Sequence, residues 1–491
     1  MSADLFMVRL EQLGQIVTGK TPPKSVEDAY DCHGIPFITP KDMDGRKRID
    51  TTERYLSDSG LGAVKRSLVP RNSVAVSCIG SDMGKAVLVD RDSVTNQQIN
   101  TILIDQERWN PEYIYYLLST KQQLLKDIAG GSATPILNKG HFGKVEIAVP
   151  SKEIQDEAAR ILGAFDEKIR LNHQINQTLE QMAQAIFKSW FVDFEPVKAK
   201  IAALGAGGSE EDALLAAMQA ISGKDAGQLA RMQAEQPEQY AELRATAELF
   251  PSAMQDAAQG SANAAGGRMP GAASELGEIP EGWEVSQIGN EVTVVGGGTP
   301  STKNPDFWEG GDIHWTTPKD LSNLSDKVLL DTERKITHAG LAKISSGLLP
   351  IDTVLMSSRA PVGYLALAKT PVAVNQGYIA MKCEGRLSPE FVIQWCSANM
   401  PEIKGRASGT TFAEISKKNF KIIPVIVPAK SLVSAYTASV KLLYDAIEVK
   451  VRESMNLAQL RDTLLPKLLS GELTLPGTEE PQTESQDAAH G

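Results

Sequence analysis

Short apolar or alternating runs dominate the first part of the chain. SVAVSCIG at 73–80, AVLVD at 86–90 and VEIAVP at 145–150 are mostly apolar or alternate with a period of two, which predicts β-strands. Turns rich in Gly, Pro and Asp separate the runs, and PEYIYYLLSTKQQLLKDI at 111–128 predicts a helix. Residues 1–150 are therefore predicted to form a mixed α/β module, which we call module 1.

A much longer periodicity follows module 1. In residues 151–197, and again in 429–473, apolar side chains recur every three or four positions between polar ones. This heptad-like spacing predicts two long helices that form a coiled coil, with Met182 and Leu460 in the apolar stripes. A helix of about 40 residues spans roughly 60 Å. We expect the helices to pair antiparallel within the chain, because this buries both stripes. The alternative is that each helix lies on its own module.

The second half of the chain repeats the first. IPFITPKDM at 35–43 returns as IHWTTPKDL at 313–321, an offset of 278 residues. This period is far longer than the roughly 20–50 residues of solenoid repeats. Residues 281–428 therefore form module 2, and two similar halves can present two similar surfaces to a two-fold target such as duplex DNA. Two shorter motifs return near the same offset: TTER (51–54) as DTER (331–334), and NQQ (96–98) as NQG (375–377).

The segment between the two halves has a different composition. Residues 198–280 are rich in Ala, Gly, Gln and Glu, and we interpret them as a variable linker with helical stretches at 210–222 and 238–249. GSANAAGG at 260–267 and the polar tail at 474–491 are expected to be disordered.

Composition and charge limit the class of protein. At 491 residues and 42% hydrophobic content, the chain is long enough for several packed domains. It has no apolar run of the roughly 20 residues that span a bilayer, and MSADLF is unlike a signal peptide, so we expect a cytoplasmic protein. The net charge is −11, but the two modules are neutral and the excess acid lies in 151–280 and 429–491. DNA binding by local basic patches is therefore allowed, with help from a basic partner.

No motif in the chain predicts catalysis. GQIVTGKT at 14–21 matches the phosphate-loop pattern, but such a loop must open a helix, and Pro22 and Pro23 directly after Thr21 disfavour one. The four cysteines form no CxxC pair, which favours reduced, buried thiols over a zinc site. The chain also lacks an [ND]PP[YF] tetrapeptide and a Gly-rich cofactor loop. We therefore predict no catalytic residue, no metal and no cofactor in this chain.

Comparison of the two modules separates two kinds of DNA contact. Residues kept in both, such as the TPKD motif, suit scaffold or backbone contacts, whereas residues that differ suit base recognition by Arg, Lys, Asn or Gln. For each candidate, the alternative is a solvated surface residue. The candidates in module 1 are Lys41, Arg46, Lys47, Arg48, Lys85, Gln97, Gln98, Asn100, Ser132, Thr134 and Lys139. The candidates in module 2 are Lys319, Lys327, Lys335, Arg359, Asn375, Gln376, Tyr378, Thr410, Thr411, Lys417 and Lys418.

Large apolar residues mark the end of each long helix. One interpretation is that they pack the helix ends together, and the other is that they form a surface on which a partner subunit docks. The candidates for subunit docking are Trp190, Phe191 and Phe194 in the first helix, and Leu465, Leu468 and Leu469 in the second.

The repeated motifs and two longer stretches resemble one known family. The stretches are LNHQINQTLEQMAQAIFKSWFVDFEPV at 171–197 and LRDTLLPKLLSGEL at 460–473. With the TPKD and NQG motifs and the plan of module followed by helix, they resemble the specificity subunit of type I restriction–modification systems. The similarity covers nearly the whole chain except the Ala/Gly-rich part of the linker and the tail. The long linker and NQQ at 96–98 depart from the family pattern.

The resemblance implies a division of roles within a complex. Two target-recognition domains would each bind one half of a split sequence in double-stranded DNA, and the paired helices would fix the spacer between the halves. Two modification subunits would dock on the helical region and carry S-adenosylmethionine and the adenine-N6 chemistry. Restriction subunits with motor and nuclease activity would join them and use ATP and Mg.

We therefore predict a non-catalytic DNA-recognition subunit that acts in defence against foreign DNA. A methylation-only system without a nuclease is the alternative within this class. A free-standing DNA-modifying enzyme is an alternative from another class, and the missing motifs disfavour it. A protein-binding coiled-coil scaffold is a third alternative, and it would not retain DNA.

Overall fold

The computed structural model divides into two compact units. Unit 1 comprises Met1–Ile169 and Asn456–Gly491, and unit 2 comprises Arg170–Met455. Unit 1 contains module 1 and unit 2 contains module 2, and each long helix contributes one part to each unit. The structure describes residues 5–80, 82–130, 136–262, 276–409, 413–470 and 472–473.

Module 1 is built from two five-stranded sheets and one strand pair. The strand orders are β2-β11-β8-β9-β5 and β3-β6-β4-β10-β7, and β1 pairs antiparallel with β12. The strands are β1 (Phe6–Arg9), β2 (Gly14–Thr18), β3 (Tyr30–Asp31), β4 (Ile35–Ile38), β5 (Arg48–Ile49), β6 (Tyr55–Leu56), β7 (Leu68–Val69), β8 (Val74–Ser77), β9 (Ala86–Val89), β10 (Ser93–Thr95), β11 (Ile99–Ile104) and β12 (Glu146–Val149). The helices are α1 (Asp58–Val64), α2 (Pro111–Ser119), α3 (Gln122–Ile128) and α4 (Lys139–Gly143).

Module 2 repeats the main sheet and the strand pair of module 1, and its second sheet has three strands instead of five. Its main sheet has the order β16-β23-β20-β21-β18, its second sheet is β19-β17-β22, and β15 pairs antiparallel with β24. The strands are β15 (Glu284–Gln287), β16 (Thr293–Val295), β17 (Ile313–Thr316), β18 (Val328–Leu329), β19 (Arg334–Ile336), β20 (Val354–Ser357), β21 (Leu365–Ala368), β22 (Ala373–Val374), β23 (Tyr378–Lys382) and β24 (Pro424–Val427). The helices are α11 (Ile288–Glu291), α12 (Pro318–Ser322), α13 (His338–Leu341), α14 (Pro389–Ala398), α15 (Met400–Gly405) and α16 (Lys417–Lys421). The predicted mixed α/β fold with an internal repeat is confirmed.

The middle strand of each main sheet, β8 or β20, is apolar on both faces because each face packs against a hydrophobic core. In β8, Val74 and Val76 pack in one hydrophobic core while Ala75 packs in another. Successive side chains of a strand point to opposite faces, so this sheet lies between two cores. The same alternation separates Leu355 from its neighbours in β20.

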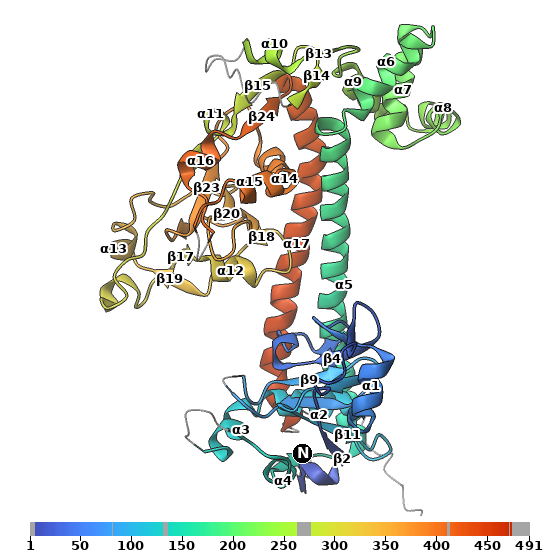
Figure 1. The fold of residues 1–491 in the computed structure, drawn as a ribbon. Helices are drawn as coiled ribbons and strands as arrows, with labels where there is room; N and C mark the ends of the chain where they lie inside the picture. Colours follow the sequence, from blue (N-terminus) through green and yellow to red (C-terminus); the bar gives the residue numbers. More distant parts are fainter. Residues whose placement is uncertain are drawn as a thin grey trace, which may run out of the picture. The chain divides into compact units, whose positions relative to one another are not determined.

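Two helices of 40 residues each follow the modules. They are α5 (Lys152–Phe191) and α17 (Lys430–Leu469). In unit 2, the Asn172 amide donates to Ser454 Oγ at 3.2 Å, and the Phe187 and Tyr436 ring centroids lie 6.0 Å apart. Contacts further along α5 thus fall further back along α17, so the helices pair antiparallel in this unit, as predicted (Figure 1).

The same helices also pair in unit 1. The Arg461 guanidinium donates to Asp166 Oδ1 at 2.6 Å, and Leu162 shares a buried core with Leu468. The first helix is shorter than the predicted range, because it ends at Phe191. Phe194 then takes a left-handed conformation with φ of 55°, and a new helix begins.

The segment we predicted to be a linker is largely helical. Both predicted helical stretches form, and the surrounding residues fold with them around a small core of Leu214, Ala217, Met218, Leu229 and Ala247. Up to residue 262 the segment is therefore a packed helical region rather than a plain linker. The remainder of the expected disordered run, 263–267, and the tail at 474–491 lie outside the described residues. The elements are α6 (Glu195–Gly205), α7 (Glu210–Ser222), α8 (Ala226–Glu235), α9 (Pro237–Glu248), β13 (Met254–Asp256), α10 (Ala257–Ala262) and β14 (Glu278–Pro280).

The cysteines differ in their burial. Cys78 and Cys396 are buried and Cys383 is half-buried, but Cys32 is exposed, so the prediction of buried thiols is wrong for Cys32. All four are free thiols. Across the described part of the chain, no helix combines the length and the apolar character that crossing a bilayer requires.

Candidate nucleic-acid interface

The repeated Thr-Pro-Lys-Asp motif forms the same turn in both modules. In module 1, the Thr39 N–H and hydroxyl both donate to Asp42 Oδ2 at 2.8 Å, and the Glu53 N–H donates to Asp42 Oδ1 at 2.9 Å. Asp42 is buried, so it ties this turn to the TTER segment from inside the module. The residues that make the same three bonds in module 2 are Thr317, Asp320 and Glu333. The TPKD motif and the TTER or DTER segment recur together because the aspartate of the first is hydrogen-bonded to the backbone of the second.

The lysine of this motif remains at the surface. Lys41 Nζ lies 3.9 Å from Glu53, and Lys319 Nζ lies 2.8 Å from Glu333, with all four side chains more than half exposed. Exposed ion pairs contribute only about 0–1 kcal/mol to stability. Both lysines can therefore exchange their carboxylate partner for a phosphate at little cost.

A hollow on module 2 brings three predicted contact residues together. Lys319 follows β17, Arg359 follows β20, and Asn375 follows β22, and all three line a depression of about 470 Å³. The remaining residues that line it are Thr317, Pro318, Ser322, Ala360 and Tyr364. The hollow thus carries the ammonium of Lys319, the guanidinium of Arg359 and the amide of Asn375. These are groups that bind phosphates and base edges.

The Asn-Gln motif forms a second feature shared by the modules. Gln97 and Gln376 are exposed. The Oε1 atom of each accepts a hydrogen bond from a threonine hydroxyl, from Thr21 at 2.5 Å and from Thr299 at 2.6 Å. These hydrogen bonds hold the side chains of Gln97 and Gln376 in a defined orientation. A side-chain amide held in this way suits contact with DNA.

The GQIVTGKT segment has a structural role at this turn. Residues 14–18 are strand β2, which pairs antiparallel with β11, so the segment does not open a helix. A Cβ at Gly19 would lie only 2.1 Å from the carbonyl oxygen of Asn96, so only glycine fits there. This close approach accounts for the glycine without any phosphate.

Two polar candidates, Asn100 and Tyr378, turn inward, and their prediction as DNA contacts is wrong; the prediction for the half-buried Gln98 stays a prediction. Asn100 is buried and donates to the carbonyl of Leu137 at 3.3 Å. Tyr378 is buried, and its hydroxyl donates to the carbonyl of Thr317 at 2.6 Å. Gln98 is half-buried and bonds within its own turn. The Asn100 and Tyr378 side chains thus satisfy buried polar groups of the module instead of facing outward.

The basic run at 46–48 is also used inside unit 1. Lys47 is mostly buried and lies 2.8 Å from Glu112 of α2 and 3.3 Å from Asp166 of α5. Arg48 lies 2.7 Å from the same Glu112. Arg46 is more exposed but is clamped by neighbouring carboxylates at 3.0 Å. Lys47 therefore ties module 1 to α5, and Arg48 pairs with Glu112 of α2; their role as DNA contacts stays a prediction.

The ionisation of Glu112 reflects this anchor. Burial alone would raise the pKa of its carboxyl group. Hydrogen bonds from Lys47 and Arg48, with their positive charges, outweigh burial and hold the pKa of Glu112 below its usual value. The carboxylate therefore stays charged well into the acidic range.

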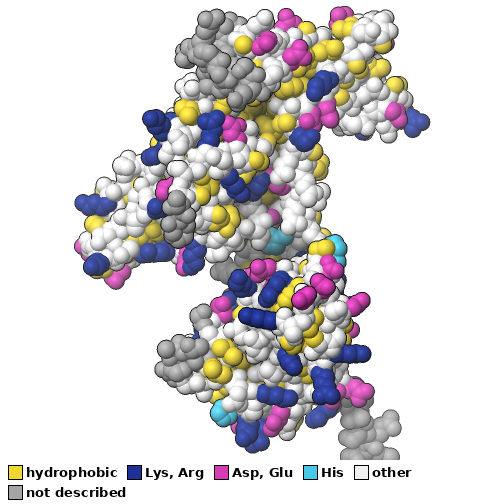
Figure 2. Space-filling model, viewed as in Figure 1, with side chains coloured by type: hydrophobic (Ala, Val, Ile, Leu, Met, Phe, Trp, Pro, Cys, Tyr) yellow, Lys and Arg dark blue, Asp and Glu magenta, His cyan; other side chains and the backbone are white. Residues whose placement is uncertain are grey.

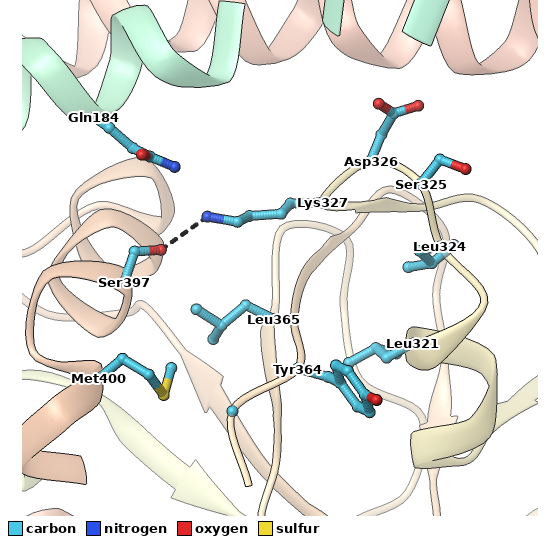
Figure 3. A pocket seen from close by; sticks show the side chains of 11 residues that line it. Gln184, Leu321, Leu324, Ser325, Asp326, Lys327, Tyr364, Leu365, Ser397 and Met400 are labelled. Carbon is cyan, nitrogen blue, oxygen red and sulfur yellow. Dashed lines mark hydrogen bonds between the residues drawn. The ribbon is translucent and has the colours of Figure 1, made fainter. Parts of the chain in front are cut away.

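Module 2 has an equivalent anchor at Lys327. Leu88 donates its N–H to the carbonyl of Lys47, and Leu367 does the same to Lys327, so the two lysines occupy equivalent positions. Lys327 Nζ donates to Glu180 of α5 at 2.8 Å and to Ser397 at 3.0 Å (Figure 3). It lines a hollow of about 420 Å³ beside α5, and its role as a DNA contact stays a prediction. Burial alone would raise the pKa of Glu180, but the Lys327 charge and hydrogen bonds from Lys327, Gln184 and Tyr444 together hold that pKa below its usual value.

The remaining basic candidates stay near the surface. Lys85 lies 2.9 Å from Asp82, and Lys335 lies 3.5 Å from Asp331. Three exposed lysines stand at the first positions of short helices: Lys139 in α4, and Lys417 and Lys418 in α16. The predicted contacts Ser132, Thr134, Thr410 and Thr411 lie outside the described residues.

Surface charges of both signs are interspersed on the face shown in Figure 2. Lys and Arg side chains are scattered over the visible surface of each unit, with Asp and Glu between them. This matches the neutral balance of the modules in the sequence. Local sites such as the hollow around Arg359, rather than one broad basic face on this side, would contact a polyanion.

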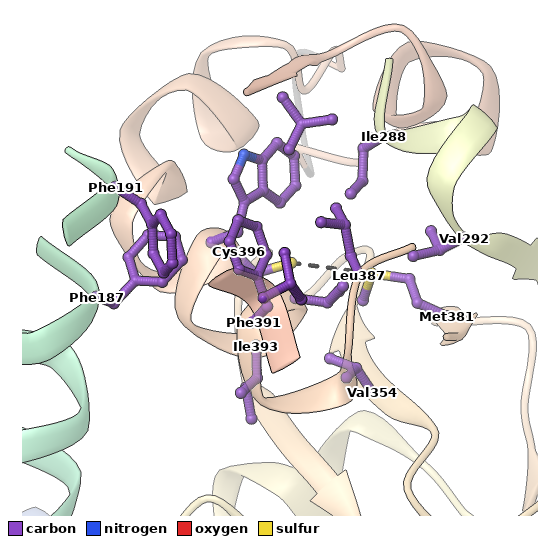
Figure 4. Close-up of a cluster of buried hydrophobic side chains, with 14 of the residues drawn as sticks. Phe187, Phe191, Ile288, Val292, Val354, Met381, Leu387, Phe391, Ile393 and Cys396 are labelled. Carbon is purple, nitrogen blue, oxygen red and sulfur yellow. Dashed lines mark hydrogen bonds between the residues drawn. The ribbon is translucent and has the colours of Figure 1, made fainter. Parts of the chain in front are cut away.

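The aromatic residues at the end of α5 form the centre of a buried core. Trp190, Phe191 and Phe194 are each less than a tenth exposed. The Phe191 ring centroid lies 4.9 Å from that of Phe391 in α14 and 5.0 Å from that of Tyr436 in α17 (Figure 4). The docking interpretation is wrong for these residues, because module 2 already covers them, and the packing interpretation is confirmed.

The leucines at the end of α17 also pack inward. Leu468 and Leu469 are buried in the core of module 1, and Tyr113 donates its hydroxyl to the carbonyl of Leu469 at 3.1 Å. Leu465 is half-buried against the same core. The docking interpretation therefore fails for Leu468 and Leu469 as well.

Other apolar residues of the helices are exposed instead. Met182 is 48% exposed and Leu460 is 52% exposed, although the heptad spacing predicted both in the buried stripes. Leu171 and Val449 are exposed too, and they were missed because each stands apart from the stripes. Leu171 and Val449 are related by the offset of 278, as are Met182 and Leu460. This recurrence of apolar residues at the repeat offset was the sequence signal that could have identified the exposed positions.

Comparison with known proteins identifies the family. Residues 4–181 and 280–431 match the pattern described as the type I restriction modification DNA specificity domain. The specificity subunit of the type I restriction enzyme HindI from Haemophilus influenzae is 30% identical over 466 residues, which cover 92% of this chain and 97% of that one. The chain belongs to the family of type I restriction–modification specificity subunits. The predicted DNA-specificity role is thereby confirmed.

Further members of this family support the assignment. The specificity subunit of the type I restriction enzyme MjaIX from Methanocaldococcus jannaschii is 24% identical over 482 residues, covering 96% of this chain and 94% of that one. A crystal structure of the S subunit of a type I restriction–modification system from M. genitalium is 16% identical. It matches with a TM-score of 0.50 over 95% of this chain and 96% of that chain. The specificity-subunit fold therefore extends over both modules and both helices.

Proposed function

We propose that this chain is a non-catalytic subunit of a type I restriction–modification complex that recognises a bipartite sequence in duplex DNA. Each module would bind one half of the target. The observation that carries the proposal is the repeated main sheet, in which both modules keep the TPKD turn and the exposed Lys41 or Lys319. Two copies of one binding module in one chain suit a target with two half-sites.

The paired helices support a role in fixing the spacer between the half-sites. In unit 2, Asn172 is buried and donates to Ser454 Oγ at 3.2 Å and to the carbonyl of Lys450 at 3.5 Å. A buried polar residue in a helix pair specifies its register, because any slip would face the amide with apolar side chains. A fixed register would make the helix pair a rigid ruler.

The exposed apolar residues of the helices support docking of two modification subunits. Leu171 and Met182 on α5 have counterparts of similar exposure in Val449 and Leu460 on α17. An apolar surface that occurs twice would bind two copies of one partner. We propose that those partners carry the S-adenosylmethionine and the adenine-N6 chemistry, and that restriction subunits supply ATP- and Mg-dependent cleavage. Within the described residues, no group of three or more His, Cys, Asp or Glu side chains suits a metal ion.

Mapping of N6-methyladenine across host DNA tests the proposal. We expect a split motif, with two defined half-sites around a spacer of constant length, that disappears when this gene is deleted. If deletion removes no methylated motif, the reconstituted complex should be tested for salt-dependent binding to duplex DNA. Absence of both would refute DNA recognition and favour a protein scaffold.

A further inference from the structure

One pair of facing surface positions carries different chemistry in the two modules. In module 2, Arg359 and Glu414 form an isolated antiparallel bridge, and the guanidinium lies 3.9 Å from the carboxylate. In module 1, Ile79 and Ile136 form the isolated antiparallel bridge at the corresponding place. Ile79 stands two residues after β8 ends, and Arg359 stands two residues after β20 ends.

The backbone beside each bridge establishes that the positions are equivalent. In module 1, Leu137 donates its N–H to the carbonyl of Cys78 at 2.9 Å. In module 2, Ile415 donates its N–H to the carbonyl of Ser358 at 3.0 Å. The same ladder therefore holds two isoleucines in one module and an arginine–glutamate pair in the other.

Neither pair has an evident role in stability. Ile136 is 55% exposed, and Ile79 is only half-buried. Both side chains of the Arg359–Glu414 pair are more than a third exposed, and such pairs contribute little to folding. The cores and the TPKD turn are kept while these surface positions change from apolar to charged. Selection for folding alone does not require either chemistry here.

The location of Arg359 favours contact with DNA. Arg359 lines the open hollow on module 2 together with Lys319 and Asn375. Lys319 has an equivalent in module 1, Lys41, and it suits a phosphate, which carries no sequence information. Arg359 has no basic counterpart in module 1, so it can distinguish the half-site of module 2 from that of module 1.

We propose that positions 79 and 136 of module 1 and positions 359 and 414 of module 2 determine specificity, with Arg359 recognising a guanine and the two isoleucines contacting a thymine methyl group. An arginine fork pairs with O6 and N7 of guanine in the major groove, whereas thymine presents a methyl group to apolar side chains. Glu414 holds the guanidinium in place in the free chain. This inference rests on the proposed function, because it assumes that each module binds one half-site.

The test compares methylated motifs in cells that carry the intact complex with variants of this chain. Arg359→Ala should relax one G·C position in one half-site and leave the other half-site unchanged. Binding of the purified complex to its duplex should weaken by about 5- to 150-fold, the range for one bidentate base contact. Arg359→Lys keeps the charge but loses the fork, so it should relax the same position, an effect that a merely structural or electrostatic role would not produce.

Two further variants complete the design. Arg452→Ala removes an exposed arginine that pairs with Glu448 on α17, and it should leave the motif and the affinity unchanged. Exchange of both positions in module 1, Ile79→Arg with Ile136→Glu, should replace an A·T position by a G·C position in the other half-site.

The outcomes separate this inference from the proposed function. If the natural chain gives no split motif, the proposed function fails and this inference fails with it. If the natural motif is present but Arg359→Ala methylates that same motif with unchanged affinity, only this inference is overturned. A module 2 half-site without any G·C pair would also overturn it.

Discussion

Truncation of Phe191 tests whether the end of α5 is a core or a docking surface. The Phe191 side chain is 6% exposed and contacts the rings of Phe187, Trp190, Trp283, Phe391 and Tyr436. Phe191→Ala would therefore leave a cavity at the junction of α5, α14 and α17. We expect unit 2 to lose stability, while the subunit-docking surface itself is unchanged.

The magnitude follows from the burial of the ring. Replacement of a buried Phe by Ala costs about 3–5 kcal/mol, because both the transfer of the ring and the contacts around the cavity are lost. Five neighbouring rings place Phe191 in the upper part of that range, since favourable aromatic pairs contribute beyond their buried area. Phe191→Leu retains most of the volume and should cost about 1.5 kcal/mol.

Urea unfolding of the full chain, followed by tryptophan fluorescence, measures this loss. Trp190 and Trp283 lie beside Phe191 and report on unit 2. With a slope of about 1–3 kcal/mol per molar urea, the midpoint for Phe191→Ala should fall by at least roughly 1 M. Met182→Ala on the same helix removes an exposed side chain and should change stability by under about 0.5 kcal/mol. An unchanged midpoint for Phe191→Ala, together with lost binding of the modification subunit, would refute the buried core.

Three further predictions concern other parts of the chain. Met182→Ala with Leu171→Ala should weaken binding of the modification subunit in a pull-down titration without lowering the unfolding midpoint; unchanged binding would remove this surface from the proposal. Lys47→Met should cost about 2–3 kcal/mol at pH 7 in urea unfolding. The pKa of Glu112 is lowered on folding, so this stabilisation is present above its unfolded value and is lost as the pH falls through its folded value. The difference between Lys47→Met and the natural chain should therefore shrink as the pH falls, and a difference that stays constant down to the acid unfolding of the natural chain would contradict the assignment. Insertion of one heptad into α5 should alter the spacer of the methylated motif and leave its half-site letters unchanged, and changed letters would contradict the ruler.

Most of the fold could be predicted from the sequence, because its signals are periodic and repeated. Period-two runs such as that around Val74 gave strands, heptad spacing gave the helices, and the offset of 278 gave the second module. The helical segment at 198–262 was underestimated, because Ala-rich helices with a small core resemble a linker in composition. The precise end of α5 depends on the left-handed turn at Phe194, which has no strong sequence signal.

The contact residues were harder to predict, since exposure depends on partners that are distant in the sequence. Lys47 is recruited by Glu112 and Asp166, and nothing in the local run of basic residues reveals those carboxylates. Asn100 was an avoidable error, because it lies within the apolar run of β11, where a polar residue usually satisfies buried groups. Lys319, Arg359 and Asn375 come together in one hollow of module 2, and their role as DNA contacts stays a prediction.

The core of unit 1 has a consequence for how the chain folds during its synthesis. Leu468 and Leu469, near the end of the chain, complete the core that Tyr113 and Leu162 begin. Equivalent positions of α5 and α17 are 278 residues apart, which takes roughly 15–55 s to synthesise at 5–20 residues per second. During that interval α5 can pack on module 1 through residues such as Leu162, but it lacks its contacts with α17. Apolar side chains of α5 that pack on α17 therefore stay exposed to solvent until α17 has been synthesised, and exposed apolar surface of this kind is prone to aggregation.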